Sequence, residues 1–380
     1  MSSRSLVWVG PLYDQSGYGY VTRNYLRALL RSGFQIYCIP VAADHRSFLR
    51  EEEIAELTQV HDWQPLSGKT VPVVFNVDGT MLTPLRQSVR DHLATLSIVP
   101  QREIAVSIFE THRIPETWVS AFNRLDEVWV PSQFNRETFT ASGVSPEKIR
   151  VVPYAIDTEF FTPDQAPPPH NALRILYVFE FGFRKGVDLL LDSYCQAFSP
   201  TDPVELVLKT WSRAGVNVLQ YMQSYLFYRF GVMGRTQYPT IQLMNGPIGQ
   251  QELLQLYRSA DLYISTDRAN GWGMPVMESM ACGVPSMAID WSGGTEFLNA
   301  NNGYPIPVDG SLEACDARLV EQNDIYRGQK WATVEPRTVV DVMRSAVNDP
   351  ARGLKSVKAR QTSLQYSLSA VGDIVKSILE

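Results

Sequence analysis

Short apolar runs of strand length alternate with longer amphipathic segments through the first part of the chain. The pattern predicts strands at Leu6–Val9, Gln35–Val41, Val73–Val77, Glu103–Phe109, Glu127–Pro131 and Val151–Ala155. Between them, apolar residues recur at helical spacing over Val21–Arg31, which ends near Gly33, and over Gln133–Ser142. Because strands and helices alternate, the pattern predicts a parallel, doubly wound α/β sheet with helices on both faces.

The alternation restarts after a proline-rich stretch, Phe161–His170, whose three consecutive prolines predict a stiff, exposed connector. Strands are predicted at Leu173–Phe179, Val204–Lys209, Thr240–Met244, Leu262–Ser265 and Val284–Ile289, and helices at Gly186–Phe198 and Gln251–Arg258. The length of 380 residues also favours two domains. We therefore predict a first domain over residues 1–165 and a second over residues 166–355, with a ligand at the carboxyl ends of the strands.

One segment of the second half, Ser212–Tyr238, does not fit this alternation. It has an apolar face at steps of three or four residues, formed by Val216, Leu219, Met222, Leu226 and Phe230. We interpret it as an extra surface helix packed on the second sheet, in preference to a contact with a membrane surface or with another copy of the chain.

Composition narrows the class of protein. Hydrophobic residues make up 44% of the chain and charged residues 19%, which is typical of a well-cored globular protein. The net charge of −6 argues against nucleic acid as the main partner and weakens an electrostatic hold on anionic membranes. Four scattered cysteines show no metal-ligand spacing and predict reduced core thiols: Cys38, Cys195, Cys282 and Cys315. The apolar run near the N-terminus is too short for a signal peptide, and no run is long enough to span a membrane. We expect a soluble, cytoplasmic protein, with peripheral contact to the inner face of a membrane left open.

The most informative stretch covers residues 261–298. A predicted strand meets the glycine-broken turn Asn270–Gly273, and Pro275 is then suited to the first position of a helix. Glu278 is predicted in the first turn of that helix, and Gly283 is placed to end it. After a second strand, Gly293-Gly294 repeats the arrangement. A glycine turn that leads into a helix N-terminus aims backbone N–H groups at a phosphate, and a nearby carboxylate can hold ribose hydroxyls. The stretch therefore predicts a binding site for a nucleoside diphosphate.

This stretch resembles the donor-site signature of the retaining glycosyltransferases of family 4. The matching residues are Gly271, Trp272, Gly273, Pro275, Glu278, Met280, Ala281, Gly283 and Pro285. The resemblance implies the GT-B fold, in which two Rossmann-like domains face a cleft, and a donor site that includes Met274. One position departs from the signature, because Asn270 stands where the family has a glutamate that reaches the donor sugar. An amide both donates and accepts hydrogen bonds but carries no charge. As an alternative, Asn270 supports the glycine turn and Asp267 contacts the sugar.

Two further segments carry candidate phosphate ligands. Arg184-Lys185-Gly186 lies at a predicted strand-to-helix turn, where two cations would neutralise the charge that grows as a sugar–phosphate bond breaks. The arginine usual in the family five residues before Lys185 is replaced by Glu180, so the clamp rests on Arg184 and Lys185, with Lys209 in reserve. The glycine loop Ser16–Gly19 resembles the family's loop beside the donor phosphates, and implies contacts from Gly17 and, behind it, Gly19.

The resemblance implies further roles. A histidine that contacts the donor sugar at a strand end corresponds by alignment to Glu110, with His112 two residues on, and we regard both as catalytic candidates. The nucleobase would lie against the turn formed by Asn245, Gly246 and Ile248. The last helix, residues 356–380, would pack back on the first domain.

The resemblance also implies the activity: transfer of a sugar from a nucleoside-diphosphate sugar to a glycan, lipid-linked or small-molecule acceptor, with retention of configuration and without a metal or other cofactor. Two alternatives stay open: a nucleotide-sugar epimerase of the same fold, and a degenerate protein that binds donor without turnover. The sequence leaves the sugar, the base, the acceptor and the oligomeric state undetermined.

Overall fold

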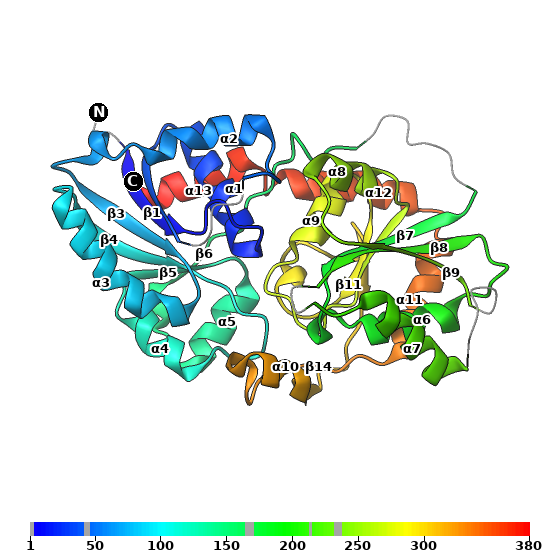
Figure 1. Ribbon diagram of the computed structural model, residues 1–380. Coiled ribbons are helices and arrows are strands. Elements are labelled where there is room, and N and C mark those ends of the chain that lie inside the picture. Colours follow the sequence, from blue (N-terminus) through cyan, green and yellow to red (C-terminus); the bar gives the residue numbers. More distant parts are fainter. Residues whose placement is uncertain (1–3, 42–45, 164–170, 213–214, 232–237) are drawn as a thin grey trace. The chain divides into compact units, whose positions relative to one another are not determined.

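A computed structural model describes residues 4–41, 46–163, 171–212, 215–231 and 238–380. The chain folds as two compact units (Figure 1). Unit 1 comprises Met1–Thr158 and Gln365–Glu380, and unit 2 comprises Glu159–Leu364. Each unit is built on a parallel sheet of six strands. Most of the predicted proline-rich connector, residues 164–170, lies outside the described residues.

The sheet of unit 1 has the strand order β2-β1-β3-β4-β5-β6, and all neighbours are parallel. Its strands are β1 (Ser5–Gly10), β2 (Gln35–Pro40), β3 (Thr70–Asn76), β4 (Val99–Val106), β5 (Glu127–Val130) and β6 (Ile149–Val151). Two predicted strands were placed too late in the chain. β4 ends three residues before Phe109, and β6 ends at Val151, where the prediction began, because pairing with the neighbouring strand rather than apolar content decides where each strand stops.

The helices of unit 1 are α1 (Gly17–Arg31), α2 (Glu51–Leu57), α3 (Gly79–Thr95), α4 (Glu116–Asn123), α5 (Gln133–Ser142) and α13 (Leu368–Leu379). The C-terminal helix α13 packs against α1 so closely that a Cβ added at Gly372 would lie 2.8 Å from the Ala28 carbonyl oxygen. The backbone N–H of Ile156 donates to the Tyr366 carbonyl at 2.9 Å, which ties the start of this last segment to unit 1. The segment predicted as one helix over residues 356–380 is two helices, because α12 (Arg352–Leu364) belongs to unit 2.

The sheet of unit 2 has the strand order β12-β11-β10-β7-β8-β9. Its strands are β7 (Leu173–Glu180), β8 (Val204–Trp211), β9 (Thr240–Asn245), β10 (Leu262–Ser265), β11 (Ser286–Ile289) and β12 (Tyr304–Ile306), all parallel to their neighbours. The chain winds outward from β7 to β9 and then returns to build β10 to β12 on the other side of β7. The strand order therefore reverses between β7 and β10, and ligands bind at such a switch point in open parallel sheets.

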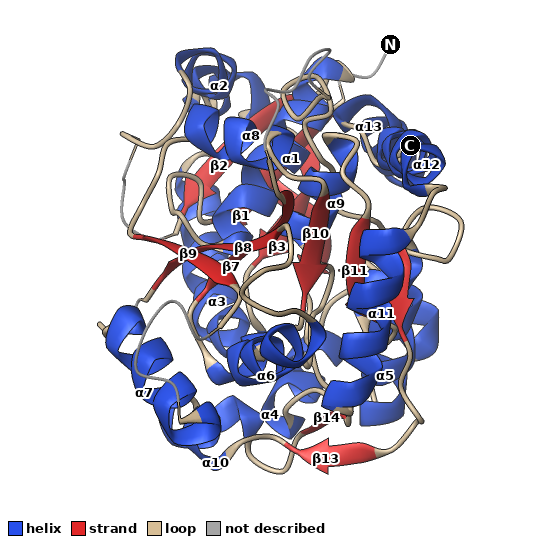
Figure 2. Cartoon of the chain, turned by 90° about the vertical axis from the view of Figure 1, so that its right-hand side faces the viewer, coloured by secondary structure: helices blue, strands red, loops and turns tan. Residues whose placement is uncertain are grey.

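The helices around this sheet are α6 (Val187–Ala197), α7 (Val218–Phe230), α8 (Gln250–Arg258), α9 (Met274–Ala281), α11 (Pro336–Asn348) and α12. A small antiparallel hairpin, β13 (Leu312–Ala314) and β14 (Lys330–Ala332), encloses the short helix α10 (Ala317–Gln322) at the lower edge of Figure 2. The sequence pattern gave no prediction for this hairpin. Among the described residues, no helix is long and apolar enough to cross a membrane.

The extra helix expected within Ser212–Tyr238 is present as α7, which is shorter than predicted. Tyr225 donates to the Asp188 carbonyl at 3.3 Å, and Arg229 donates to the Asp192 carboxylate at 3.1 Å, so α7 is fastened to α6 rather than to the sheet itself. Its other side lines a hollow of about 940 Å³ together with β9, the edge strand of the sheet.

Candidate functional site

A single turn of 3-10 helix, Phe183–Lys185, follows β7 at the switch point and leads through Gly186 into α6. We call residues Phe183–Gly186 the cation turn. Gly186 has φ +61°, and a Cβ added there would lie 2.2 Å from the Thr266 carbonyl oxygen, so only glycine fits. The Tyr177 hydroxyl lies 2.8 Å from the Lys185 carbonyl oxygen, and the Thr266 hydroxyl shares its one proton between the carbonyls of Lys185 and Gly186, at 3.1 and 3.0 Å. Tyr177 of β7 and Thr266 of the loop after β10 therefore contact the backbone of the cation turn.

Both predicted cations of this turn already have protein partners. Arg184 donates to the Ala269 carbonyl at 2.7 Å, and the Lys185 ammonium lies 2.5 Å from the Asp267 carboxylate. The second oxygen of Asp267 accepts a hydrogen bond from the buried Tyr177 hydroxyl. The Lys185 side chain is 20% exposed, whereas that of Asp267 is 6% exposed. Asp267 is thus occupied in orienting Lys185, which weighs against the alternative that it contacts a sugar.

The glycine loop Asn270–Gly273 is shaped by the side chain of its first residue. The Asn270 Oδ1 accepts the backbone N–H of Trp272 at 2.9 Å, which is the hydrogen bond of an Asx turn. The Asn270 backbone N–H donates to the Ser292 hydroxyl at 3.1 Å, and its carbonyl accepts the N–H of Gly293 at 2.8 Å. Asn270 therefore builds the loop, and its Nδ2 lies beside Gly273, 2.8 Å from the position of an added Cβ.

The loop after β11 meets the glycine loop at a tight approach that only glycine allows. A Cβ added at Gly293 would lie 1.7 Å from the Gly271 carbonyl oxygen. The preceding residue, Ser292, is buried and has φ +70° and ψ −158°, a region almost restricted to glycine. The helix expected at Gly293-Gly294 is only a 3-10 turn, Gly293–Glu296. No sequence signal marks Ser292, because the backbone strain follows from the contact between the two loops.

Helix α9 begins at Met274, one residue before the predicted first position, Pro275. Glu278 is consequently its fifth residue and lies in the second turn rather than the first. The Glu278 side chain is buried, and it accepts a hydrogen bond from the Tyr257 hydroxyl at 2.7 Å. Burial and the neighbouring Glu278 charge raise the pKa of Tyr257 well above its usual range, so this hydroxyl stays a donor. Sequence reasoning missed Tyr257, which lies 21 residues away on α8.

The reserve cation, Lys209, is buried within β8, two residues before the strand ends at Trp211. Its ammonium donates to the Gly246 carbonyl and, at 3.4 Å, to the Thr210 carbonyl, and burial lowers its pKa. Lys209 therefore fixes the turn predicted to receive the nucleobase. Within that turn, Asn245 is exposed at the end of β9 and Ile248 is half-buried.

The glycines predicted in unit 1 lie at a helix start rather than in a loop. Helix α1 begins at Gly17, four residues before Val21, because the Ser16 hydroxyl caps it by accepting the N–H of Gly19 at 3.2 Å. Gly17 is exposed and Gly19 is buried. Their backbone N–H groups thus belong to the first turn of a helix of 15 residues.

Glu110 and His112 are both half-buried in the irregular segment that follows β4. Asn135 of α5 donates to the Phe109 carbonyl at 2.6 Å, and Ser132 caps the same helix. This contact places the segment beside the N-terminus of α5. Among the described residues, no group of three or more His, Cys, Asp or Glu side chains could hold a metal ion.

Comparison with known proteins agrees with this geometry. Residues 241–319 match the family described as Glycosyl transferases group 1. HepE of Anabaena, solved in complex with UDP and glucose, has a TM-score of 0.69 at 14% identity, with 99% of both chains covered. Sucrose-phosphate synthase of Thermosynechococcus elongatus has a TM-score of 0.67 at 15% identity, covering 99% of this chain and 98% of its own. The chain has the GT-B fold, and residues 241–319 are similar to the group 1 glycosyl transferases. The predicted fold class is therefore confirmed.

Two sequence relatives are also similar. D-inositol 3-phosphate glycosyltransferase 1 of Catenulispora acidiphila is 26% identical over 218 residues, which cover 55% of this chain and 46% of the relative. A component of the phosphatidylinositol N-acetylglucosaminyltransferase of Homo sapiens is 19% identical over 305 residues, covering 75% of this chain and 56% of the relative. The chain thus spans about half the length of each relative. These similarities support the prediction of a glycosyltransferase.

Proposed function

We propose that the protein transfers a sugar from a nucleoside-diphosphate sugar to an acceptor hydroxyl, with retention of configuration. The observation that carries the proposal is the switch point of unit 2. There the cation turn is bonded to Ala269, directly before the glycine loop Asn270–Gly273, and that loop is bonded to the loop at Gly293 and leads into α9, which carries the buried Glu278. Cations, a glycine loop that leads into a helix N-terminus and a carboxylate are the features that a diphosphate and a ribose require.

The diphosphate is assigned to Arg184 and Lys185. Lys185 is paired with the Asp267 carboxylate, and part of the Lys185 side chain is exposed, so a phosphate oxygen can compete for its ammonium. In a retaining transfer, the leaving diphosphate gains charge as the bond to the sugar breaks, and two positioned cations stabilise that charge. The departing phosphate oxygen takes the proton of the acceptor hydroxyl. The proposal needs no metal ion and no cofactor.

The ribose is assigned to Glu278, whose carboxylate the Tyr257 hydroxyl holds in place. The nucleobase is assigned to the turn at Asn245, Gly246 and Ile248. The donor sugar is assigned to Asn270, since its Oδ1 already accepts the Trp272 N–H and its Nδ2 remains as a second, donating group. The glutamate that the family has at this position can only accept hydrogen bonds, whereas the Asn270 amide can also donate one. The amide therefore favours a donor sugar with an acceptor oxygen facing Asn270.

The acceptor is the least defined part of the proposal. Both sequence relatives are named for inositol-based substrates, which makes D-inositol 3-phosphate and phosphatidylinositol the first acceptors to test. Gly17, Gly19, Glu110 and His112 of unit 1 stay predictions for contacts with donor or acceptor. A cytoplasmic location, with peripheral membrane contact for a lipid-linked acceptor, belongs to the same proposal.

A donor screen followed by a transfer assay tests this function. Thermal unfolding is measured with UDP-, GDP-, ADP- and TDP-linked sugars, because a ligand that binds only the folded state raises the midpoint. Transfer to the two inositol acceptors and to simple sugars is then followed with the donor that binds, and the anomeric configuration of the product is read by NMR.

The outcomes separate the alternatives. A product with inverted configuration would contradict retention, and a new free sugar formed without acceptor would identify an epimerase. Tight donor binding without turnover across the acceptor panel would identify a degenerate donor-binding protein, the alternative that Asn270 raises. No binding of any nucleotide sugar would overturn the whole proposal.

A further inference from the structure

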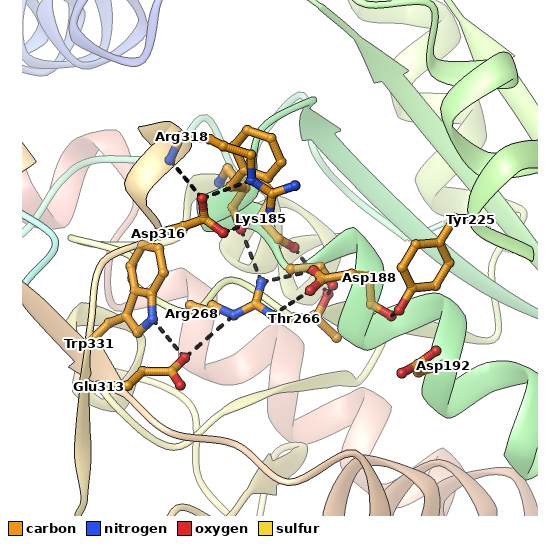
Figure 3. Close-up of polar contacts among 12 residues, drawn as sticks. Lys185, Asp188, Asp192, Tyr225, Thr266, Arg268, Glu313, Asp316, Arg318 and Trp331 are labelled. Atoms are coloured by element: carbon orange, nitrogen blue, oxygen red, sulfur yellow. Dashed lines mark hydrogen bonds and ion pairs between the residues drawn. The ribbon is translucent and has the colours of Figure 1, made fainter. Parts of the chain in front are cut away.

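Arg268 lies next to the cation turn and contacts it with both its side chain and its backbone (Figure 3). Its guanidinium donates to both oxygens of the Asp188 carboxylate, at 2.9 and 2.7 Å, and to the Phe183 carbonyl at 3.1 Å. Its backbone N–H also donates to the Arg184 carbonyl at 2.8 Å. One residue of the loop after β10 therefore bonds to two residues of the cation turn and to the first turn of α6 that follows it.

The charge of Arg268 is neutralised by these contacts. Burial by itself would raise the pKa of Asp188, but the hydrogen bonds and charge of Arg268 outweigh it and hold that pKa below its usual range. The Arg268 side chain is 19% exposed, and its planar fork is committed to one carboxylate in a fixed orientation. Arg268 is thus built to hold a neighbour in place rather than to meet a phosphate.

A second segment contacts the Phe183 ring of the cation turn and Arg268. We call Leu312–Ala332, which spans β13, α10 and β14, the clasp segment. The Arg318 guanidinium of α10 lies 3.8 Å from the centre of the Phe183 ring and pairs with Asp316 at 2.6 Å. Glu313 of β13 lies 3.9 Å from the Arg268 guanidinium and accepts the Trp331 indole N–H at 2.9 Å, as Figure 3 shows.

The cation turn needs such support because it is too short to hold its own shape. A single 3-10 turn has few internal hydrogen bonds, and its geometry is weak in isolation. The turn nevertheless carries two of the charged groups of the donor site, Arg184 and Lys185, in consecutive positions. Displacing such groups by even about 1 Å can cost catalysis on the order of 100-fold.

We propose that Arg268 is a positioning residue that, together with the clasp segment, fixes the cation turn so that Arg184 and Lys185 meet the diphosphate in one geometry. The part of this inference that concerns the diphosphate rests on the function proposed above. Arg268 itself touches no substrate atom and makes or breaks no bond. The clasp segment is correspondingly a part of the donor site that acts through the Phe183 ring and Arg268.

Variants from both sides of the turn test this inference. The set is Arg268→Ala, Arg268→Lys and Arg318→Ala, with Arg327→Ala as the matched control. Like Arg318, Arg327 lies in the clasp segment and pairs with an aspartate, Asp324, at 2.5 Å. Its side chain is 72% exposed, so it serves as the solvent-exposed control. Arg268→Lys keeps the charge and loses the fork, so it separates charge from geometry.

The first measurement is hydrogen exchange of the peptide covering the cation turn and the start of α6 in the ligand-free protein. We expect about tenfold faster exchange there in Arg268→Ala, a smaller increase in Arg318→Ala, and none in Arg327→Ala. Unchanged exchange in Arg268→Ala would overturn the inference. This readout needs no nucleotide, so its failure is distinguishable from a failure of the proposed function.

The second measurement compares the affinities for a nucleoside diphosphate and the matching monophosphate, using the base identified in the donor screen. Arg268→Ala should weaken diphosphate binding about fivefold and lower turnover about tenfold, while monophosphate binding stays within about twofold. Arg268→Lys should recover part of the loss. An equal loss of diphosphate and monophosphate affinity in Arg268→Ala would show that Arg268 only supports the fold. If Arg268→Lys restores thermal stability but recovers neither diphosphate affinity nor turnover, the positioning role is likewise overturned.

Discussion

The two glycine-containing segments predicted to meet the donor are held in very different ways. In unit 2, the cation turn is bonded to β7 through Tyr177 and to the loop after β10 through Thr266 and Arg268. In unit 1, the first turn of α1 is held by Ser16, whose hydroxyl caps the helix, and by Asp14, whose carboxylate accepts the Ser16 N–H at 2.7 Å. The first segment is braced by contacts from several elements, whereas the second is braced by its own capping residues and by one longer-range contact, from the Asn76 amide of β3 to the Tyr18 carbonyl at 3.1 Å.

This difference indicates which part of the reaction each segment is suited to serve. Charges that stabilise a leaving group are effective only if they are already in place, because they then cost no reorganisation when the bond breaks. A capped helix start can present backbone N–H groups with local support alone. The braced cation turn thus fits leaving-group stabilisation, and the capped start of α1 fits a simpler contact with an anion or a hydroxyl.

The largest expected effect concerns Lys185 in the braced segment. Lys185→Ala removes a positioned cation from the leaving diphosphate, and we expect turnover to fall about 100-fold. His112→Ala, in the irregular segment that follows β4 of unit 1, should lower turnover about tenfold or less. The measurement is steady-state turnover of both variants with the donor and acceptor found in the screen. A larger loss for His112→Ala would reverse the comparison between the two units.

Lys185→Ala also leaves the buried Asp267 carboxylate without its cation, so a control must separate stability from catalysis. The double variant Lys185→Ala/Asp267→Asn removes that uncompensated charge. Thermal stability should recover towards that of the unmodified protein while turnover stays low. Recovery of turnover along with stability would show that Lys185 serves the fold and not the leaving group.

Alanine substitutions at Gly186 of the cation turn and at Gly17 of α1 compare the backbone constraints of the two segments. Gly186→Ala places a Cβ 2.2 Å from the Thr266 carbonyl at φ +61°, so we expect a loss of about 3 kcal/mol in the free energy of unfolding. Gly17→Ala meets nothing within 4 Å among the described residues and should stay within about 0.5 kcal/mol. Urea denaturation of both variants measures this. A stable Gly17→Ala variant with reduced activity would place Gly17 against a ligand.

Much of this fold was readable from the sequence, since buried parallel strands are near-continuous apolar runs. The run Leu6–Val9 corresponds to β1, and the helix Gln133–Ser142 is reproduced without a change of bounds. The glycine and proline signals at Gly273 and Pro275 also placed the start of α9 to within one residue. These elements depend on local chemistry, which a sequence displays directly.

The contacts that brace the site could not be read in the same way. Tyr257 reaches Glu278 from another helix, and the guanidinium of Arg268 reaches Asp188 across 80 residues of sequence. The clasp segment has strands of only three residues each, of which β13 is exposed throughout, so its hairpin lacks the apolar alternation that marks a sheet. Long-range polar contacts leave no local period, and they are the part of the site that only the structure supplies.

A smaller effect is expected at Glu278 of α9, which tests whether unit 2 also binds the ribose. Glu278→Gln keeps the size of the side chain but removes the charge that strengthens hydrogen bonds to ribose hydroxyls. We expect nucleotide affinity to fall about tenfold, equivalent to about 1.4 kcal/mol. Calorimetric titration with the nucleoside diphosphate measures it, with Glu296→Gln as a control on a neighbouring loop. Unchanged affinity in Glu278→Gln would remove the ribose assignment.

An effect of similar size is expected at Asn270, whose side chain shapes the glycine loop and is also assigned to the donor sugar. Asn270→Ala loses the hydrogen bond from the Trp272 N–H and should lower the free energy of unfolding by about 1 kcal/mol. Asn270→Asp keeps an acceptor for that N–H but cannot donate, so it should keep stability while turnover falls about tenfold if Nδ2 serves the sugar. Asn270→Glu restores the family's residue and tests whether the donor preference shifts. Full turnover in Asn270→Asp would show that the Asn270 amide only shapes the glycine loop. The cation turn and Glu278 would then bind the nucleotide, while other residues recognise the sugar.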